Sequence, residues 1–150
     1  MKVERMETLG VNVKNLDEAI RFFSDLLGIT FVKRVEGASK REVVITEHAD
    51  RAFEEIKLKN ALDRTGFLEL IESDPPVQKE GIRSIHFKVP DIEEAKAEMK
   101  RKGIRLIKDV EFKDVKLGGL KEAIFHPDDV YGIRLCLVEY EAPTLVDSHD

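Results

Sequence analysis

Two stretches of the chain share one alternating pattern of apolar and polar residues. Residues 8–19 (TLGVNVKNLDEA) and 84–95 (SIHFKVPDIEEA) align without a gap. Every second residue is apolar at the start of each stretch: Leu9, Val11 and Val13 in the first, and Ile85, Phe87 and Val89 in the second. This alternation predicts a strand in each copy with one buried face.

Each predicted strand leads into a helix with its own start and stop signals. Asn15 and Asp91 are suited to cap the first helical turns, and a glutamate follows three positions after each of them. Apolar residues then recur at helical spacing along one side, and Gly28 and Gly103 end the helices. We expect each helix to lie across the apolar face of its sheet.

The correspondence continues to the end of each copy. Three more strands are predicted in each, at residues 29–36, 52–60 and 67–72 and at residues 104–111, 121–125 and 134–139. Residues 37–51 have no counterpart of equal length in the second copy. Their pattern fits either a short helix or an extra strand around residues 43–45. The sequence therefore predicts an α+β protein made of two βαβββ units.

The chain length predicts one domain, because 150 residues are enough for one sizeable core and too few for two. Repeat one spans about residues 6–73 and repeat two about residues 81–140. The linker, residues 74–80, contains two prolines that favour an extended path. Residues 141–150 are polar, and we expect a frayed tail.

Charge and hydropathy exclude two classes of partner. The 25 Lys and Arg residues are outnumbered by 30 Asp and Glu residues, with no basic stripe, so a nucleic-acid partner is not expected. No apolar run approaches the ~20 residues that span a membrane, and the first residues do not resemble a secretory signal. A cytoplasmic protein is expected. The 37% of charged residues and the single glutamine indicate a thermophilic source.

Residues 15–28 (NLDEAIRFFSDLLG) and 67–70 (FLEL) form a pattern that the second half of the chain repeats. This pattern resembles the vicinal oxygen chelate superfamily, which includes glyoxalase I, methylmalonyl-CoA epimerase, extradiol dioxygenases and the fosfomycin and bleomycin resistance proteins. The second copy is most similar to the epimerase and glyoxalase branch. The resemblance covers about residues 6–140. It implies a curved, largely antiparallel sheet around a cavity, helices on the outer face, a small-molecule ligand and a homodimer.

The resemblance also implies four positions for divalent-metal ligands, typically His, Glu or Gln, His and Glu. Thr8, Glu69, Ser84 and Cys136 occupy these positions here. Only Glu69 is a customary ligand, and two hydroxyl groups are poor substitutes for imidazoles around a divalent cation. We therefore predict that the usual metal site is absent and that the protein has no cofactor.

A rebuilt metal site is the alternative. His86 lies two residues after Ser84, on the same face of the predicted strand. With Glu69 and Cys136 it would make an open three-ligand site for Zn, Ni, Co or Mn. The other interpretation of His86 is a histidine that contacts a ligand or is hydrogen-bonded within the fold.

Three more side chains have both a functional and a structural interpretation. Glu69 is either a catalytic base or ligand anchor, or a carboxylate satisfied by a neighbour. Cys136, the only cysteine, excludes an internal disulfide and is either a small buried apolar residue or an isolated thiol. Arg134 either binds a carboxylate or phosphate, or forms a salt bridge.

These observations leave three hypotheses about function. The first is a small-molecule-binding protein without the usual metal, whose ligand contacts Thr8, Glu69, Ser84, His86, Arg134 and Cys136. The second is a lyase or epimerase that acts on a thioester or 2-oxo compound, with an altered metal site or with Glu69 transferring protons. The third is a non-catalytic dimeric scaffold.

Overall fold

All strands in the described part of the chain, residues 1–34, 41–49, 57–112 and 119–146, belong to one sheet. In the computed structural model the first copy contributes β1 (Arg5–Asn12), β2 (Phe31–Arg34), β3 (Arg41–Ile45), β4 (Lys57–Asp63) and β5 (Leu68–Asp74). The second copy contributes β6 (Gly81–Lys88), β7 (Leu106–Phe112), β8 (Leu120–Phe125) and β9 (Arg134–Tyr140). Helices α1 (Leu16–Leu27) and α3 (Ile92–Arg101) follow β1 and β6, and the 3-10 turn η1 (Pro127–Asp129) precedes β9. The strand order is β2-β4-β5-β1-β6-β9-β8-β7-β3.

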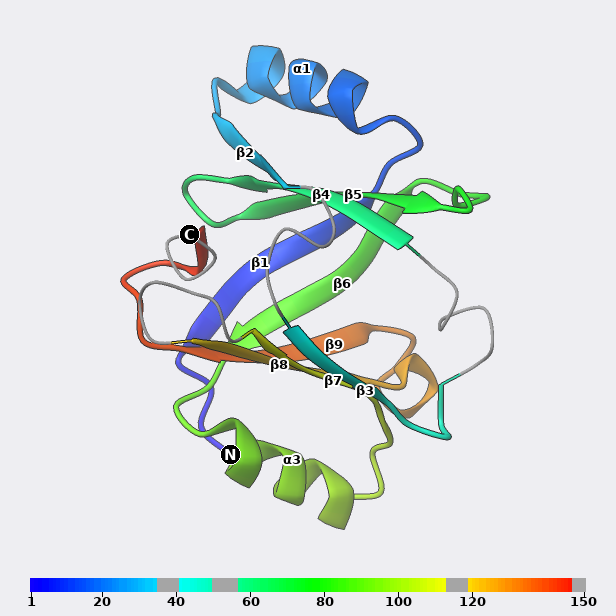
Figure 1. Ribbon diagram of the computed structural model, residues 1–150, viewed down its shortest axis with the longest axis vertical. Coiled ribbons are helices and arrows are strands. Elements are labelled where there is room, and N and C mark those ends of the chain that lie inside the picture. Colours follow the sequence, from blue (N-terminus) through cyan, green and yellow to red (C-terminus); the bar gives the residue numbers. More distant parts are fainter. Residues whose placement is uncertain (35–40, 50–56, 113–118, 147–150) are drawn as a thin grey trace.

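The sheet curls so that its two halves face each other, with the helices on the outside (Figure 1). β1 and β6 pair antiparallel and join the two copies. The pairs β1–β5 and β6–β9 are parallel, and the other neighbouring strands are antiparallel. The predicted α+β fold, a curved and largely antiparallel sheet with outer helices, is confirmed. No helix in the described residues is long and apolar enough to cross a membrane.

Of the segment that the sequence left open, residues 37–51, the structure describes residues 41–49, and these contain a strand and no helix. β3 leaves the first copy and pairs antiparallel with β7, so it becomes the outer edge of the second half. The strand predicted at residues 52–60 is β4, which ends at Asp63, and residues 50–56 lie outside the described part of the chain. Residues 35 and 36 of the predicted second strand lie outside it as well.

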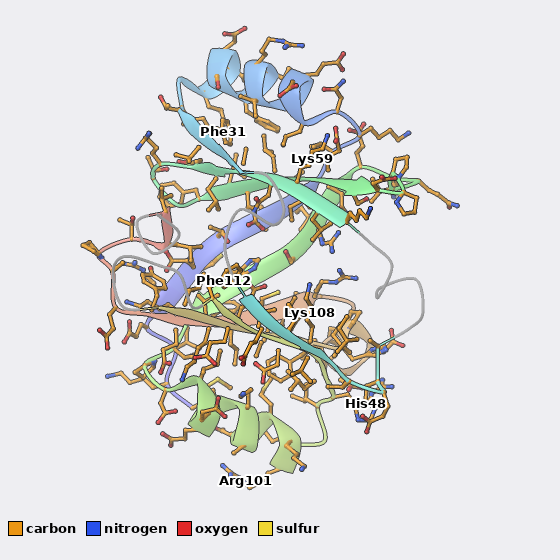
Figure 2. The ribbon with its side chains drawn as sticks, viewed as in Figure 1. Phe31, His48, Lys59, Arg101, Lys108 and Phe112 are labelled. Carbon is orange, nitrogen blue, oxygen red and sulfur yellow. The ribbon has the colours of Figure 1, made fainter. Side chains whose placement is uncertain are left out.

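The helices begin where the capping residues predict. The side chain of Asn15 accepts a hydrogen bond from the Glu18 N–H, and Asp91 accepts one from the Glu94 N–H, at 3.0 Å in both cases. α1 packs on an apolar cluster that contains Val11, Ala61, Leu70 and Phe31. α3 packs on one that contains Phe87, Ala123, Phe125 and Leu137. Phe31 is labelled in Figure 2, between α1 and the sheet.

The predicted frayed tail, residues 141–150, is wrong for residues 141–146. Residues 141–146 are not frayed, because Ala142, Leu145 and Val146 are each only 4% exposed. They pack in one apolar cluster with Leu62, Leu120, Val138 and Tyr140, and Phe112 borders this cluster (Figure 2). The segment thus fills an apolar gap to which both halves of the sheet contribute. Residues 147–150 lie outside the described part of the chain.

Candidate functional site

The candidate site residues lie on the face of the sheet that no helix covers, which we call the inner face. Val11, Leu70 and Leu137 point toward the helices, so side chains one residue away point to the opposite side. The inner face therefore carries Thr8, Asn12, Asn60, Glu69, Ser84, His86, Glu122, Arg134 and Cys136.

Strand register arranges the six residues predicted from the sequence in two rows. Thr8 lies opposite His86, which lies opposite Cys136. Glu69 lies opposite Gly10, which is followed across the sheet by Ser84 and Arg134. The structure thus brings all six to the same surface. They come from β5, β1, β6 and β9, the central strands of the sheet.

His86, Glu122 and Cys136 form a compact group on β6, β8 and β9. One ligand atom from each residue lies within 4.8 Å of the others, and His86 Nε2 is 3.5 Å from Glu122 Oε1. His86 is 6% and Cys136 is 1% exposed. Burial opposes the charged imidazole, but Cys136 and Glu122 outweigh burial and raise the pKa of His86 above its ordinary value. An imidazole in this position favours a positive charge.

Glu69 is not part of this group. Its Oε2 atom accepts a hydrogen bond from Asn60 Nδ2 at 3.0 Å. The described residues therefore bring Glu122, and not Glu69, together with His86 and Cys136. The only signal for Glu122 in the sequence is its place between Leu120 and Ile124, on the same face of β8, and the strand register was needed to place it beside His86.

Arg83 belongs to the inner face although strict alternation would turn it away. Gly10 pairs with Ser84 but Val11 pairs with Ile82, so Arg83 is an extra residue in β6. Such a bulge redirects a side chain. Arg83 Nη1 donates a hydrogen bond to Asn12 Oδ1 at 3.2 Å. Sequence reasoning missed this residue.

The pKa of the Arg83 guanidinium depends on charged neighbours from the same surface. Burial and the positive charge of Arg134 lower the pKa of Arg83 to about 10, while Cys136, Glu69 and Glu122 act in the opposite direction. All four of these neighbours have side chains on the inner face. Two guanidinium groups and two carboxylates therefore share this surface, and the two cations repel each other.

The four positions at which the resemblance places metal ligands do not fit a divalent cation. The Thr8 hydroxyl is buried without a hydrogen-bond partner in the described part of the protein. The Ser84 hydroxyl lies against Gly10, where an added Cβ would come within 2.3 Å of it. Two hydroxyls, one thiol and one carboxylate that already binds Asn60 make a poor donor set for a hard cation.

A hollow lies on the outer side, between α3 and the residues that follow β3. It has a volume of about 570 Å³ and is lined in part by His48, Lys96 and Arg105. His48 is labelled in Figure 2. Lys96 already pairs with Asp109 at 2.7 Å, and Arg105 pairs with Asp129 at 2.9 Å. Since these cations are neutralised within the fold, we assign no ligand to this hollow.

Solved structures of similar fold include several epimerases. Streptomyces coelicolor methylmalonyl-CoA epimerase, in complex with 2-nitronate-propionyl-CoA, matches 94% of this chain and 100% of its own at 18% identity and a TM-score of 0.59. The Mycobacterium tuberculosis methylmalonyl-CoA epimerase matches 93% of this chain and 90% of its own, also at 18% identity, with a TM-score of 0.57. A hypothetical protein from Bacillus halodurans matches 93% of this chain and 96% of its own at 18% identity and a TM-score of 0.61. At these identities the likeness shows the fold alone.

Sequence comparison identifies the family. No curated protein matches the chain. The model of the Glyoxalase/Bleomycin resistance protein/Dioxygenase superfamily matches residues 8–120, from within β1, through the rest of the first copy, to the start of β8. The chain belongs to the glyoxalase/bleomycin resistance protein/dioxygenase superfamily.

Proposed function

We propose that the chain binds a small organic carboxylate, free or as part of an acyl thioester, on its inner face. The observation that carries this proposal is the pair of guanidinium groups of Arg83 and Arg134 on that surface. Arginine binds carboxylates through two parallel hydrogen bonds, which a lysine cannot reproduce. This is the first of the three hypotheses, with the charge of the ligand now specified.

The charges around Arg83 support an anionic ligand. Burial and Arg134 together disfavour the charged form of Arg83, as its lowered pKa shows. An anion bound between the two arginines would offset that repulsion. The epimerase of similar fold was solved with 2-nitronate-propionyl-CoA, a thioester that carries a negatively charged group, and another structure holds methylmalonyl-CoA.

Binding is tested by thermal shift and calorimetry with short carboxylates, their CoA thioesters and free CoA as probes. We expect a carboxylate or its thioester to bind, and free CoA to bind more weakly. Arg83→Gln and Arg134→Gln should each weaken binding about tenfold or more, because a hydrogen bond to a charged group is lost. Arg21→Gln on the exposed side of α1 is the matched control and should have no effect.

Two results would contradict the proposal. One is that no carboxylate in the set stabilises the protein. The other is that Arg21→Gln weakens binding as much as Arg83→Gln does, since the effect would then come from net charge. Free CoA binding as tightly as its thioesters would show instead that the nucleotide portion, and not the acyl carboxylate, is recognised.

Proton transfer at the carbon beside the bound carbonyl is a second candidate function. The Glu69 charge acts on Arg83, so a carboxylate held by Arg83 lies near a possible base. Incubation of a bound thioester in D₂O would show deuterium at that carbon, and Glu69→Gln should abolish the exchange. Exchange that persists in Glu69→Gln would exclude Glu69 as the base.

A further inference from the structure

We propose that His86, Glu122 and Cys136 bind one zinc ion, at a site formed by the second copy alone. Three of the four family positions, Thr8, Glu69 and Ser84, have no part in it. The proposal does not rest on the proposed carboxylate ligand, because none of the three donors is Arg83 or Arg134.

The geometry of the three donors suits a tetrahedral ion. They come from β6, β8 and β9, which are neighbours in the sheet, with β9 in the middle. The His86 Nε2 to Glu122 Oε1 distance is 3.5 Å, against about 3.3–3.5 Å for two such ligands across a tetrahedral zinc with ordinary bond lengths. All three ligand atoms lie within 4.8 Å of one another, so small side-chain rotations suffice to bring them to one ion.

The chemistry of the donors favours zinc over harder cations. A thiolate and an imidazole are preferred by zinc, whereas Mg²⁺ and Ca²⁺ require mainly oxygen ligands. A thiolate and a carboxylate together also balance the charge of a divalent ion. Three protein ligands leave the fourth tetrahedral position open, as in catalytic zinc sites.

The two ring nitrogens of the buried His86 differ in their surroundings. Nε2 faces Glu122, whereas Nδ1 is buried and has no hydrogen-bond partner in the described part of the protein. Zinc bound through Nε2 would leave Nδ1 as an N–H without an acceptor, so the proposal stands on the three donors and their distances. The Glu122 side chain is 20% exposed, so an ion can reach the group from its side.

The test uses the full chain, stripped of metal with EDTA. Zinc is titrated against a chromophoric chelator, and Co²⁺ serves as a spectroscopic probe of tetrahedral geometry and of a sulfur ligand. We expect one ion per chain and a thiolate-to-cobalt charge-transfer band. Cys136→Ser should remove that band, and Glu122→Gln should weaken zinc binding at least about tenfold.

Glu69→Gln is the matched control, because it removes one negative charge from the same inner face without touching the proposed ligands. It should leave zinc affinity unchanged. Zinc binding lost in Glu69→Gln and retained in Glu122→Gln would overturn the proposal in favour of the set predicted from the sequence. Absence of the cobalt band in the folded parent would overturn it altogether.

Cys136→Ser needs a control for folding, and the zinc assay must be separable from the carboxylate proposal. Cys136 is fully buried, so thermal unfolding in EDTA must show that Cys136→Ser is folded. If it is not, Glu122→Gln at the partly exposed Glu122 is the decisive variant. No organic ligand enters the assay. A failure of zinc binding therefore leaves the carboxylate proposal standing, and the reverse also holds.

Discussion

The two copies of the βαβββ unit bury their helices to different depths. α3 buries Ile92, Ala95 and Met99, whereas Leu16 alone is fully buried in α1. On α1, Phe22, Leu26 and Leu27 are 59%, 63% and 54% exposed. In the described residues β2, the outer strand on the side of α1, has four residues, and its counterpart β7 has seven. Equivalent apolar patterns therefore predict where a helix forms but not how much of it is covered.

The largest expected effect is the loss of stability when one apolar side chain of each helix is truncated, which tests the difference in burial. Met99→Ala should lower the free energy of unfolding by about 2–5 kcal/mol, because a fully buried side chain leaves a cavity. Phe23 occupies the equivalent place in α1 and is only half-buried. Phe23→Ala should therefore lower the free energy of unfolding by only about 1–2 kcal/mol. Urea unfolding of both variants measures the two losses. A larger loss at Phe23 would mean that α1 is the better-packed helix.

The centre of the inner face differs between copies as well. The Leu9–Ile85 pair lies on the pseudo-twofold axis of the β1–β6 contact, so Gly10 in β1 is the counterpart of His86 in β6. Gly10→Ala would place a Cβ 2.3 Å from the Ser84 hydroxyl and 3.3 Å from Ile71 Cδ1. This overpacking should cost about 1–3 kcal/mol.

A double-mutant cycle separates the effect of the Ser84 hydroxyl from that of Ile71. Ser84→Ala removes the hydroxyl and leaves the Ser84 Cβ 3.6 Å from the added atom, an ordinary contact. In this background Gly10→Ala should lose most of its cost, measured by thermal unfolding. If Gly10→Ala destabilises the Ser84→Ala variant as much as the parent, the contact with Ile71, and not the Ser84 hydroxyl, excludes a larger residue at position 10.

The smallest expected effect concerns a pair of matched carboxylates. Glu72 accepts a hydrogen bond from the first N–H of α1 at 3.0 Å and pairs with Lys59 at 3.3 Å. Glu139 repeats both contacts at α3, with Ile92 N at 3.4 Å and Lys121 at 3.8 Å. Because its contacts are shorter, Glu72→Gln should cost about 1 kcal/mol at neutral pH and Glu139→Gln roughly 0.5 kcal/mol.

The contribution of Glu72 to stability depends on pH, in a direction that its pKa predicts. The hydrogen bond from Leu16 N–H, with the help of Lys59 and against the effect of burial, lowers the pKa of Glu72 below its ordinary 4.5. A carboxyl with a lower pKa in the folded state stabilises the protein above its unfolded pKa, and this contribution is lost as the pH falls below 4.5. The stability difference between the parent and Glu72→Gln should therefore shrink in acid. A constant difference would attribute the effect to packing.

Local patterns were sufficient to predict most of the fold. Alternation, caps and glycine stops are properties of adjacent residues, and the glutamates at residues 72 and 139 recur because each helix start needs an acceptor. Arg83 and Glu122 were missed because a bulge and a cross-strand neighbour depend on the register between distant strands. The buried tail was missed because its apolar partners come from both halves. The homodimer, the thermophilic source and the cytoplasmic location stay predictions.

The packed residues 142–146 also bear on how the protein is made. A ribosome releases β4 well before the residues that cover Leu62. Until residues 142–146 have emerged, an apolar surface formed by Leu62, Leu120 and Val138 faces water on the nascent chain, and such surfaces favour aggregation and chaperone binding. This surface can therefore be covered only after Val146 has been synthesised.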